Sequence, residues 1–127
     1  MVIVDGNNVM GQRVGWHRDK PAARERLIDE VAKLARSREE PHILVFDAGS
    51  ETAAAESRSG SPLAIRYARR GSTADELILE LVYHHSGLSE VSVVTSDRAL
   101  ARQVQALGAN VMRSGAFRRM LEQQLSK

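Results

Sequence analysis

Short apolar runs along the chain are separated by longer stretches in which apolar residues recur every three or four positions. The five runs predict strands buried on both faces, at residues 1–5, 42–47, 63–67, 91–95 and 110–112. The longer stretches predict helices, at residues 21–36, 73–85, 98–107 and 114–125. The first run closes with Gly6-Asn7-Asn8, which predicts a turn.

The alternation of strands and helices predicts the fold class. Each helix that connects two parallel strands lies on one face of the sheet, so the order indicates a three-layer α/β/α sandwich around a mainly parallel five-stranded sheet. The third strand is expected at an edge, because Pro62 cannot donate to a ladder. With 127 residues and no linker or repeat, we expect one domain over residues 1–127.

Composition excludes several classes of protein. The chain is 43% hydrophobic and 27% charged, which is typical of a soluble globular domain. No apolar run approaches the roughly 20 residues of a membrane span, so neither a membrane span nor a signal peptide is expected. The absence of cysteine excludes disulfide scaffolds, thiolate metal sites and cysteine nucleophiles. A cytoplasmic location is expected.

Arginine accounts for 15 of the 18 basic residues, although the net charge is only +2. The planar guanidinium binds phosphate oxygens bidentately and stacks on bases, which favours a nucleic-acid partner. A GC-rich genome would give the same arginine content, and the charge alone does not separate the two explanations.

Four of the six aspartates fall where strands end or a helix begins. Asp5 and Asp47 end the first and second strands, Asp97 follows the fourth, and Asp75 lies in the first turn of the helix after the third. In parallel sheets, sites gather beyond the carboxyl ends of the strands where strand order reverses. Asp97 could also simply cap a helix, and Asp75 could favour a helix dipole.

Four carboxylates at one edge would repel strongly, since a like-charge pair about 4 Å apart costs about 4 kcal/mol at an effective dielectric of about 20. A divalent cation would relieve this repulsion. Oxygen ligands without cysteine favour Mg²⁺ or Mn²⁺. Asp75 shares a helical stripe with Ile78 and Val82, so its carboxylate is expected to point towards the sheet.

Basic and aromatic residues lie in the loops that flank these aspartates. An acidic centre with a basic rim suits a phosphodiester backbone, and a tryptophan among these residues could stack on a base or hold its loop against the core. The candidate RNA-binding residues are Arg13, Trp16, Arg18, Arg69, Arg70 and Arg98.

Four segments together resemble the NYN domain, a branch of the PIN-like metal-dependent ribonucleases, and within it the YacP-like group. They are Ile3-Val4-Asp5-Gly6-Asn7-Asn8-Val9, Val45-Phe46-Asp47-Ala48, Gly71-Ser72-Thr73-Ala74-Asp75-Glu76-Leu77-Ile78 and Val93-Val94-Thr95-Ser96-Asp97. The segments follow the family's order over residues 1–97, and Gly108 and Ser114 are consistent with its last part.

The resemblance implies metal-binding or catalytic carboxylates at Asp5, Asp47, Asp75 and Asp97, supported by Asn8 and by Ser96 or Thr95. It also implies the strand order 3-2-1-4-5 and an endoribonuclease that uses Mg²⁺ or Mn²⁺. Such an enzyme lowers the pKa of a water molecule and leaves a 5′-phosphate and a 3′-hydroxyl. Two features depart from the family pattern: Asn7 stands where an aromatic residue is common, and residues 49–61 match nothing.

Three other interpretations remain open. A PIN-like domain without catalysis would bind RNA only. A haloacid-dehalogenase-type phosphohydrolase needs a second aspartate where Asn7 stands, and a receiver-type phosphoacceptor needs a lysine where Met112-Arg113 stands. The expected partner is RNA, in single-stranded or loop regions. The residues do not decide between a monomer and a homodimer.

Overall fold

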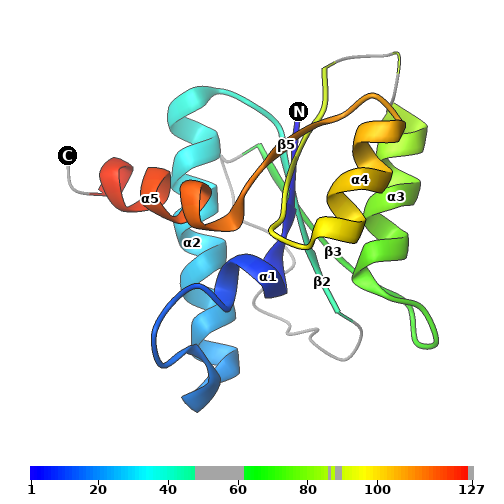
Figure 1. The fold of residues 1–127 in the computed structure, drawn as a ribbon. Coiled ribbons are helices and arrows are strands. Elements are labelled where there is room, and N and C mark those ends of the chain that lie inside the picture. The colour runs from blue at the N-terminus through cyan, green and yellow to red at the C-terminus, as the bar shows by residue number, and fades with distance from the viewer. Residues whose placement is uncertain (48–61, 86, 88–89, 126–127) are drawn as a thin grey trace.

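The computed structural model describes residues 1–47, 62–85, 87 and 90–125. Five strands lie at β1 (Val2–Asp5), β2 (His42–Phe46), β3 (Leu63–Tyr67), β4 (Ser92–Val94) and β5 (Asn110–Met112). The helices are α1 (Gly6–Met10), the 3₁₀ turn η1 (Trp16–Arg18), α2 (Lys20–Arg38), α3 (Ala74–His85), α4 (Arg98–Ala106) and α5 (Ser114–Leu125) (Figure 1).

The five strands form one parallel sheet in the order β3-β2-β1-β4-β5. This confirms the fold class, the strand order and the edge position of β3. Along the chain the sheet grows from β1 to β3 in one direction, then returns to the other side of β1 with β4. Strand order therefore reverses between β1 and β4, where Val4 pairs with Val94.

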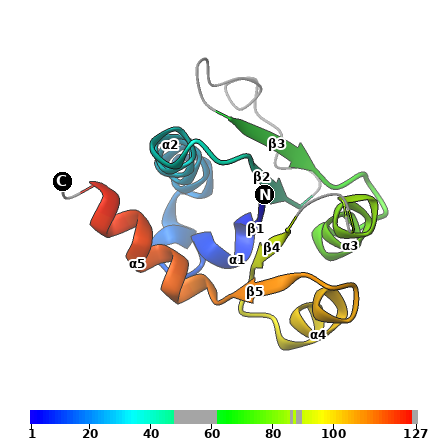
Figure 2. The ribbon, with the colours of Figure 1, turned by 90° about the horizontal axis from the view of Figure 1, so that it is seen from above.

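Helices cover both faces of the sheet, and each face has its own apolar core. One core packs Val4, Leu44 and Val94 against α1, α2 and α5, whereas the other packs Ile3, Val45 and Val93 against α3 and α4. Figure 2 shows the two helical layers on either side of the strands. Within the described ranges, no helix is both long and apolar enough to cross a membrane.

Helix starts follow their sequence signals with one difference. The Asp19 carboxylate accepts from the backbone N–H of Ala22 at 3.1 Å and caps α2. The Thr73 hydroxyl oxygen accepts from the backbone N–H of Glu76 at 3.1 Å, as a capping box requires. The Glu76 carboxylate, however, accepts from the Ser72 hydroxyl at 2.6 Å. This hydrogen bond joins the first turn of α3 to the loop that precedes it.

The predicted turn at Gly6-Asn7-Asn8 is wrong, because α1 begins directly where β1 ends. Gly6 is buried against the end of β2. A Cβ at this position would lie 2.6 Å from Cε1 of Phe46 and 2.7 Å from the carbonyl oxygen of Val45. Only glycine lets the helix start this close to the sheet, and the short helix then carries Asn7 and Asn8 over the strand ends.

Candidate active site at the carboxyl ends of the strands

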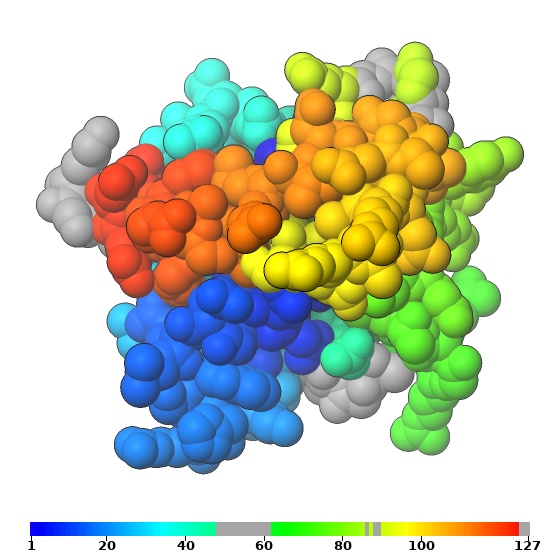
Figure 3. Space-filling view, in the orientation of Figure 1, coloured from blue at the N-terminus to red at the C-terminus, as the bar shows by residue number. Residues whose placement is uncertain are grey.

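The carboxyl ends of the central strands and the start of α3 bring four aspartates to one edge of the sheet. Asp5 ends β1, Asp47 follows β2, Asp97 follows β4, and Asp75 lies in the first turn of α3. In Figure 3, the blue surface of β1 and α1, the yellow β4–α4 junction and green α3 adjoin one another here. The position is the strand-order switch point that the sequence predicted. We call these four residues the aspartate cluster.

Asp5 is the most buried member of the cluster, with 5% of its surface exposed. Burial, together with the negative charges of Asp75 and Asp47 and against the hydrogen bonds from Thr95 and the Asn8 backbone, raises the pKa of its carboxyl from 3.8 to about 6. The Thr95 hydroxyl opposes this by donating to Asp5 Oδ2 at 2.8 Å. Asp5 therefore carries a charge at neutral pH that its surroundings disfavour.

Thr95 connects two members of the cluster. Its buried hydroxyl donates to Asp5 and accepts from the backbone N–H of Asp97 at 3.1 Å. The Asp97 carboxylate accepts from the backbone N–H of Leu100 at 3.1 Å and so caps α4. The capping interpretation of Asp97 is thus correct, and it leaves the second carboxylate oxygen for another role.

Asp75 and Asp47 complete the cluster. Burial raises the pKa of Asp75, and the charges of Asp97 and Asp47 add to that rise. Asp47 itself is exposed. The pKa of Asp5 is raised by the charges of two other members, and so is the pKa of Asp75. The four carboxylates are therefore coupled electrostatically.

Asn7 and Asn8 fix the ends of the neighbouring strands. Asn7 Oδ1 accepts from the backbone N–H of Asp47 at 2.9 Å. Asn8 Oδ1 accepts from the backbone N–H of Ser96 at 2.9 Å and from the Ser114 hydroxyl. The Ser96 hydroxyl oxygen in turn accepts from the backbone N–H of Ser114 at 3.0 Å. The two amides thus position Asp47 and the loop that leads to Asp97.

The donor chemistry of the cluster fits a hard divalent cation. All four candidate ligands are carboxylates, and no lysine or arginine in the described part of the chain forms an ion pair with them. No three acidic or histidine side chains of the described residues lie close enough to hold a metal by themselves. A Mg²⁺ ion here would therefore need one or two of these carboxylates and would fill its remaining positions with water and substrate phosphate.

Two cavities at the strand ends have arginines in their lining, and one of them includes Asp97 of the cluster. One, of about 340 Å³, lies at the end of β3 and is lined by Arg66, Arg69 and Arg70. The other, of about 390 Å³, lies beyond β4 and β5 and is lined by Arg98 and Arg113. Arg69 and Arg70 thus line the first cavity and Arg98 the second, and RNA binding by them stays a prediction. Arg66 and Arg113 were not among the candidate residues, because the sequence does not show which side chains line a cavity.

Arg13 has an internal partner in the structure. Its guanidinium donates to Glu30 at 3.0 Å, and Arg118 of α5 binds the same carboxylate at 3.0 Å. Glu30 is buried, so this ion pair ties the Arg13 loop to α2 and α5. One carboxylate between two guanidiniums leaves a net positive charge, and RNA binding by Arg13 stays a prediction.

Trp16 and Arg18 lie in η1, on the side of the molecule covered by α2. The Trp16 ring is half-buried against the α2–α5 core, and Lys20 Nζ lies 5.6 Å from its centroid. This favours the interpretation in which Trp16 holds its loop against the core. Arg18 is exposed. The unmatched residues 49–61 lie outside the described residues.

Comparison with known proteins identifies the same fold. Two crystal structures of Rae1 (YacP) from Bacillus subtilis match with a TM-score of 0.83 each. The W164L mutant is 23% identical, covering 98% of this chain and 76% of that one. The second structure is 22% identical, covering 99% and 75%. No curated protein matches in sequence. The model of the YacP-like NYN domain matches residues 2–127, and the chain belongs to this family.

Proposed function

We propose that this protein is a metal-dependent endoribonuclease that hydrolyses RNA phosphodiester bonds at the aspartate cluster. One observation carries the proposal: four aspartates from separate elements meet at the switch point of the sheet, where Asp5 is buried without a cationic partner among the described residues. A structural role for Asp5 would not require a buried charge. The chain belongs to the YacP-like NYN family. The NYN domain is a branch of the PIN-like metal-dependent ribonucleases, and this membership supports the same function.

In this proposal the aspartates bind the metal, and the neighbouring polar residues position them. One or two of the carboxylates of Asp5, Asp47, Asp75 and Asp97 would hold Mg²⁺ or Mn²⁺, with water and substrate phosphate at the remaining positions. When bound, such an ion neutralises phosphate charge and lowers the pKa of water. Thr95 holds Oδ2 of Asp5 by its hydrogen bond and so orients the carboxylate. Asn7 and Asn8 fix the strand ends that carry Asp47 and Asp97.

RNA is the substrate that the surrounding charges favour. Arginines line both flanking cavities, and arginine binds phosphate through two parallel hydrogen bonds. Single-stranded or looped RNA exposes its backbone for such contacts. The protein would thus hold the strand by its phosphates on either side of the acidic centre.

A second candidate function is RNA binding without cleavage. One observation favours it: the described residues contain no group of three acidic or histidine side chains close enough to bind a metal unaided. In that case the arginine cavities would bind RNA and the aspartates would serve the fold.

Cleavage of a labelled RNA separates the two functions. Wild-type protein is incubated with Mn²⁺ or Mg²⁺ beside Asp5→Asn, Asp97→Asn and the control Asp29→Asn, which changes an exposed aspartate of α2. Asparagine caps helices about as well as aspartate, so Asp97→Asn keeps α4 intact. The nuclease proposal expects metal-dependent internal cuts that both cluster variants lose and the control keeps. RNA retention without cuts by the wild type would refute it and support the binding module.

A further inference from the structure

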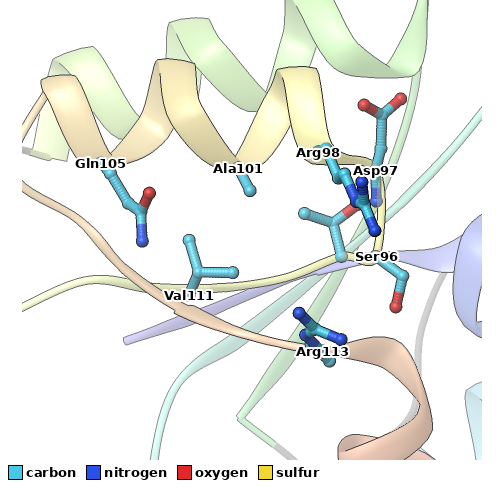
Figure 4. Close-up of a pocket in the computed structure, with 8 residues that line it drawn as sticks. Ser96, Asp97, Arg98, Ala101, Gln105, Val111 and Arg113 are labelled. Carbon is cyan, nitrogen blue, oxygen red and sulfur yellow. The ribbon is translucent and has the colours of Figure 1, made fainter.

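The cavity beyond β4 and β5 is a polar recess next to the aspartate cluster. It measures about 390 Å³ and lies between α4, β5 and the start of α5. Ala101 and Val111 form its apolar side, while Ser96, Gln105, Arg98 and Arg113 supply polar groups. Figure 4 shows Arg98 and Arg113 reaching towards Ser96 from α4 and from the end of β5. We call this recess the arginine cavity.

The arginine cavity carries two positive charges without a counter-charge. Within the described residues, neither Arg98 nor Arg113 forms an ion pair or a hydrogen bond through its side chain. The one acidic residue of the lining, Asp97, turns its carboxylate away from the cavity and towards α3 in Figure 4. Two like charges that share one recess repel each other, so an anion between them would be stabilised.

Hydrogen-bond donors add to the charge. The Ser96 hydroxyl oxygen accepts from the backbone N–H of Ser114, so its own O–H is oriented elsewhere and can donate to a ligand. Gln105 lies at the other end of the cavity in Figure 4 and carries an amide N–H₂ group. Guanidinium forks, a hydroxyl and an amide form a donor set that matches the oxygens of a phosphate group.

The order of charges along the sheet edge relates the cavity to the cluster. From β3 to β5 the strand ends carry arginines at Arg69 and Arg70, then Asp47, Asp5 and Asp97, then Arg113. Neighbouring strands lie about 4.8 Å apart, which places β5 about 10 Å from β1. A chain of phosphates that crosses this edge would meet positive charge on both sides of the acidic centre.

We infer that the arginine cavity binds one backbone phosphate of a single-stranded RNA, next to the phosphate that lies over the aspartate cluster. Arg98 and Arg113 would share that phosphate, with Ser96 donating to it. A single strand can turn its backbone into a recess, which a stiff duplex cannot do as easily. This inference rests on the proposed function for its substrate and names a contact that cleavage does not require.

Binding without cleavage tests the inference. The probe is a fluorescein-labelled, 12-nucleotide single-stranded oligouridylate, measured by anisotropy in EDTA over a range of salt concentrations. The variants are Arg98→Gln, Arg113→Gln and their combination. Arg102→Gln is the control, because Arg102 is an exposed arginine of α4 outside the cavity lining. Thermal melting of each variant confirms that it is folded.

A shared phosphate gives a distinctive pattern. Each single variant should weaken binding about tenfold, and the double variant little more than either single one, because both arginines serve one contact. The slope of log K against log salt should fall by about 0.7 in each variant. Arg102→Gln should leave the affinity within about twofold of the wild type. Cavity variants that bind like this control would overturn the inference.

The outcome for the proposed function is read separately, from cleavage of the same RNA with Mn²⁺. Wild-type protein that binds through the two arginines but does not cut would refute the nuclease and keep the phosphate contact. Metal-dependent cuts together with unchanged binding by the cavity variants would support the nuclease and refute the phosphate contact in the arginine cavity. Wild-type protein that shows no affinity for the RNA would refute both.

Discussion

Replacing Asp5 by asparagine removes the most buried negative charge of the aspartate cluster. The side chain keeps its shape, and its oxygen can still accept from the Thr95 hydroxyl. What disappears is the cost of ionising a carboxyl that is 5% exposed and faces Asp75 and Asp47. In the absence of metal, the free energy of unfolding should therefore rise in Asp5→Asn.

The size and pH dependence of this gain follow from the pKa. Burial raises the pKa of Asp5 from 3.8 to about 6, so between these values the folded protein binds more protons than the unfolded chain. Unfolding free energy then decreases as pH rises through this window. One pKa unit is about 1.4 kcal/mol, which gives a loss of about 3 kcal/mol at pH 7.5 and about 1 kcal/mol at pH 4.5. Asp5→Asn should recover most of this lost unfolding free energy.

Urea unfolding of both proteins in EDTA at the two pH values measures the difference. We expect Asp5→Asn to be the more stable by up to about 3 kcal/mol at pH 7.5, with a gap about 2 kcal/mol smaller at pH 4.5. Mn²⁺ at saturating concentration should stabilise the wild type and close the gap, since an ion bound only by the folded state raises its stability. A variant less stable than the wild type at pH 7.5 without metal would refute the reasoning.

Three further changes test the contacts around the site. Thr95→Val removes the donor to Asp5 and should raise the pKa of that carboxyl above about 6, as measured by a carboxyl-carbon NMR titration; an unchanged pKa would contradict the bond. Gly6→Ala places a methyl group against Phe46 and should lower the free energy of unfolding by about 1–3 kcal/mol in urea, whereas a neutral result would show that α1 can move away. Glu30→Gln leaves two arginines around a neutral amide and should cost about 3–5 kcal/mol in the same assay; a loss below about 1 kcal/mol would show that the ion pair is not needed.

The sheet could be predicted from the sequence because its strands are buried on both faces. Unbroken apolar runs such as that ending at Asp47 show both the strand and its end. The position of the four aspartates then followed from a general rule about parallel sheets. Their chemistry needed no contact information, because a carboxylate at a strand end is visible in the sequence itself.

Contacts between distant side chains could not be predicted in this way. Glu30 and Arg118 are 88 positions apart, and each looks like a solvated helix residue until α2 and α5 are packed together. Asn7 departs from the family pattern, yet its side-chain oxygen accepts from the backbone N–H of Asp47 at the end of the neighbouring strand. The helix α1 was missed because Gly6 is favoured in turns, and only the close approach of Phe46 explains its presence in a helix.

The hydrogen bond between Asn8 and Ser114 joins positions 106 apart, which makes the first and last helices partners in one structural unit. Contacts of such long separation carry a loop-closure cost in entropy, which tends to slow folding. A polypeptide that stops before residue 114 would have all four aspartates but would leave the β4–α4 loop without its anchor. The geometry of the acidic centre would thus depend on residues as far along the chain as Ser114, so removal of α5 should disturb aspartates that lie in other elements.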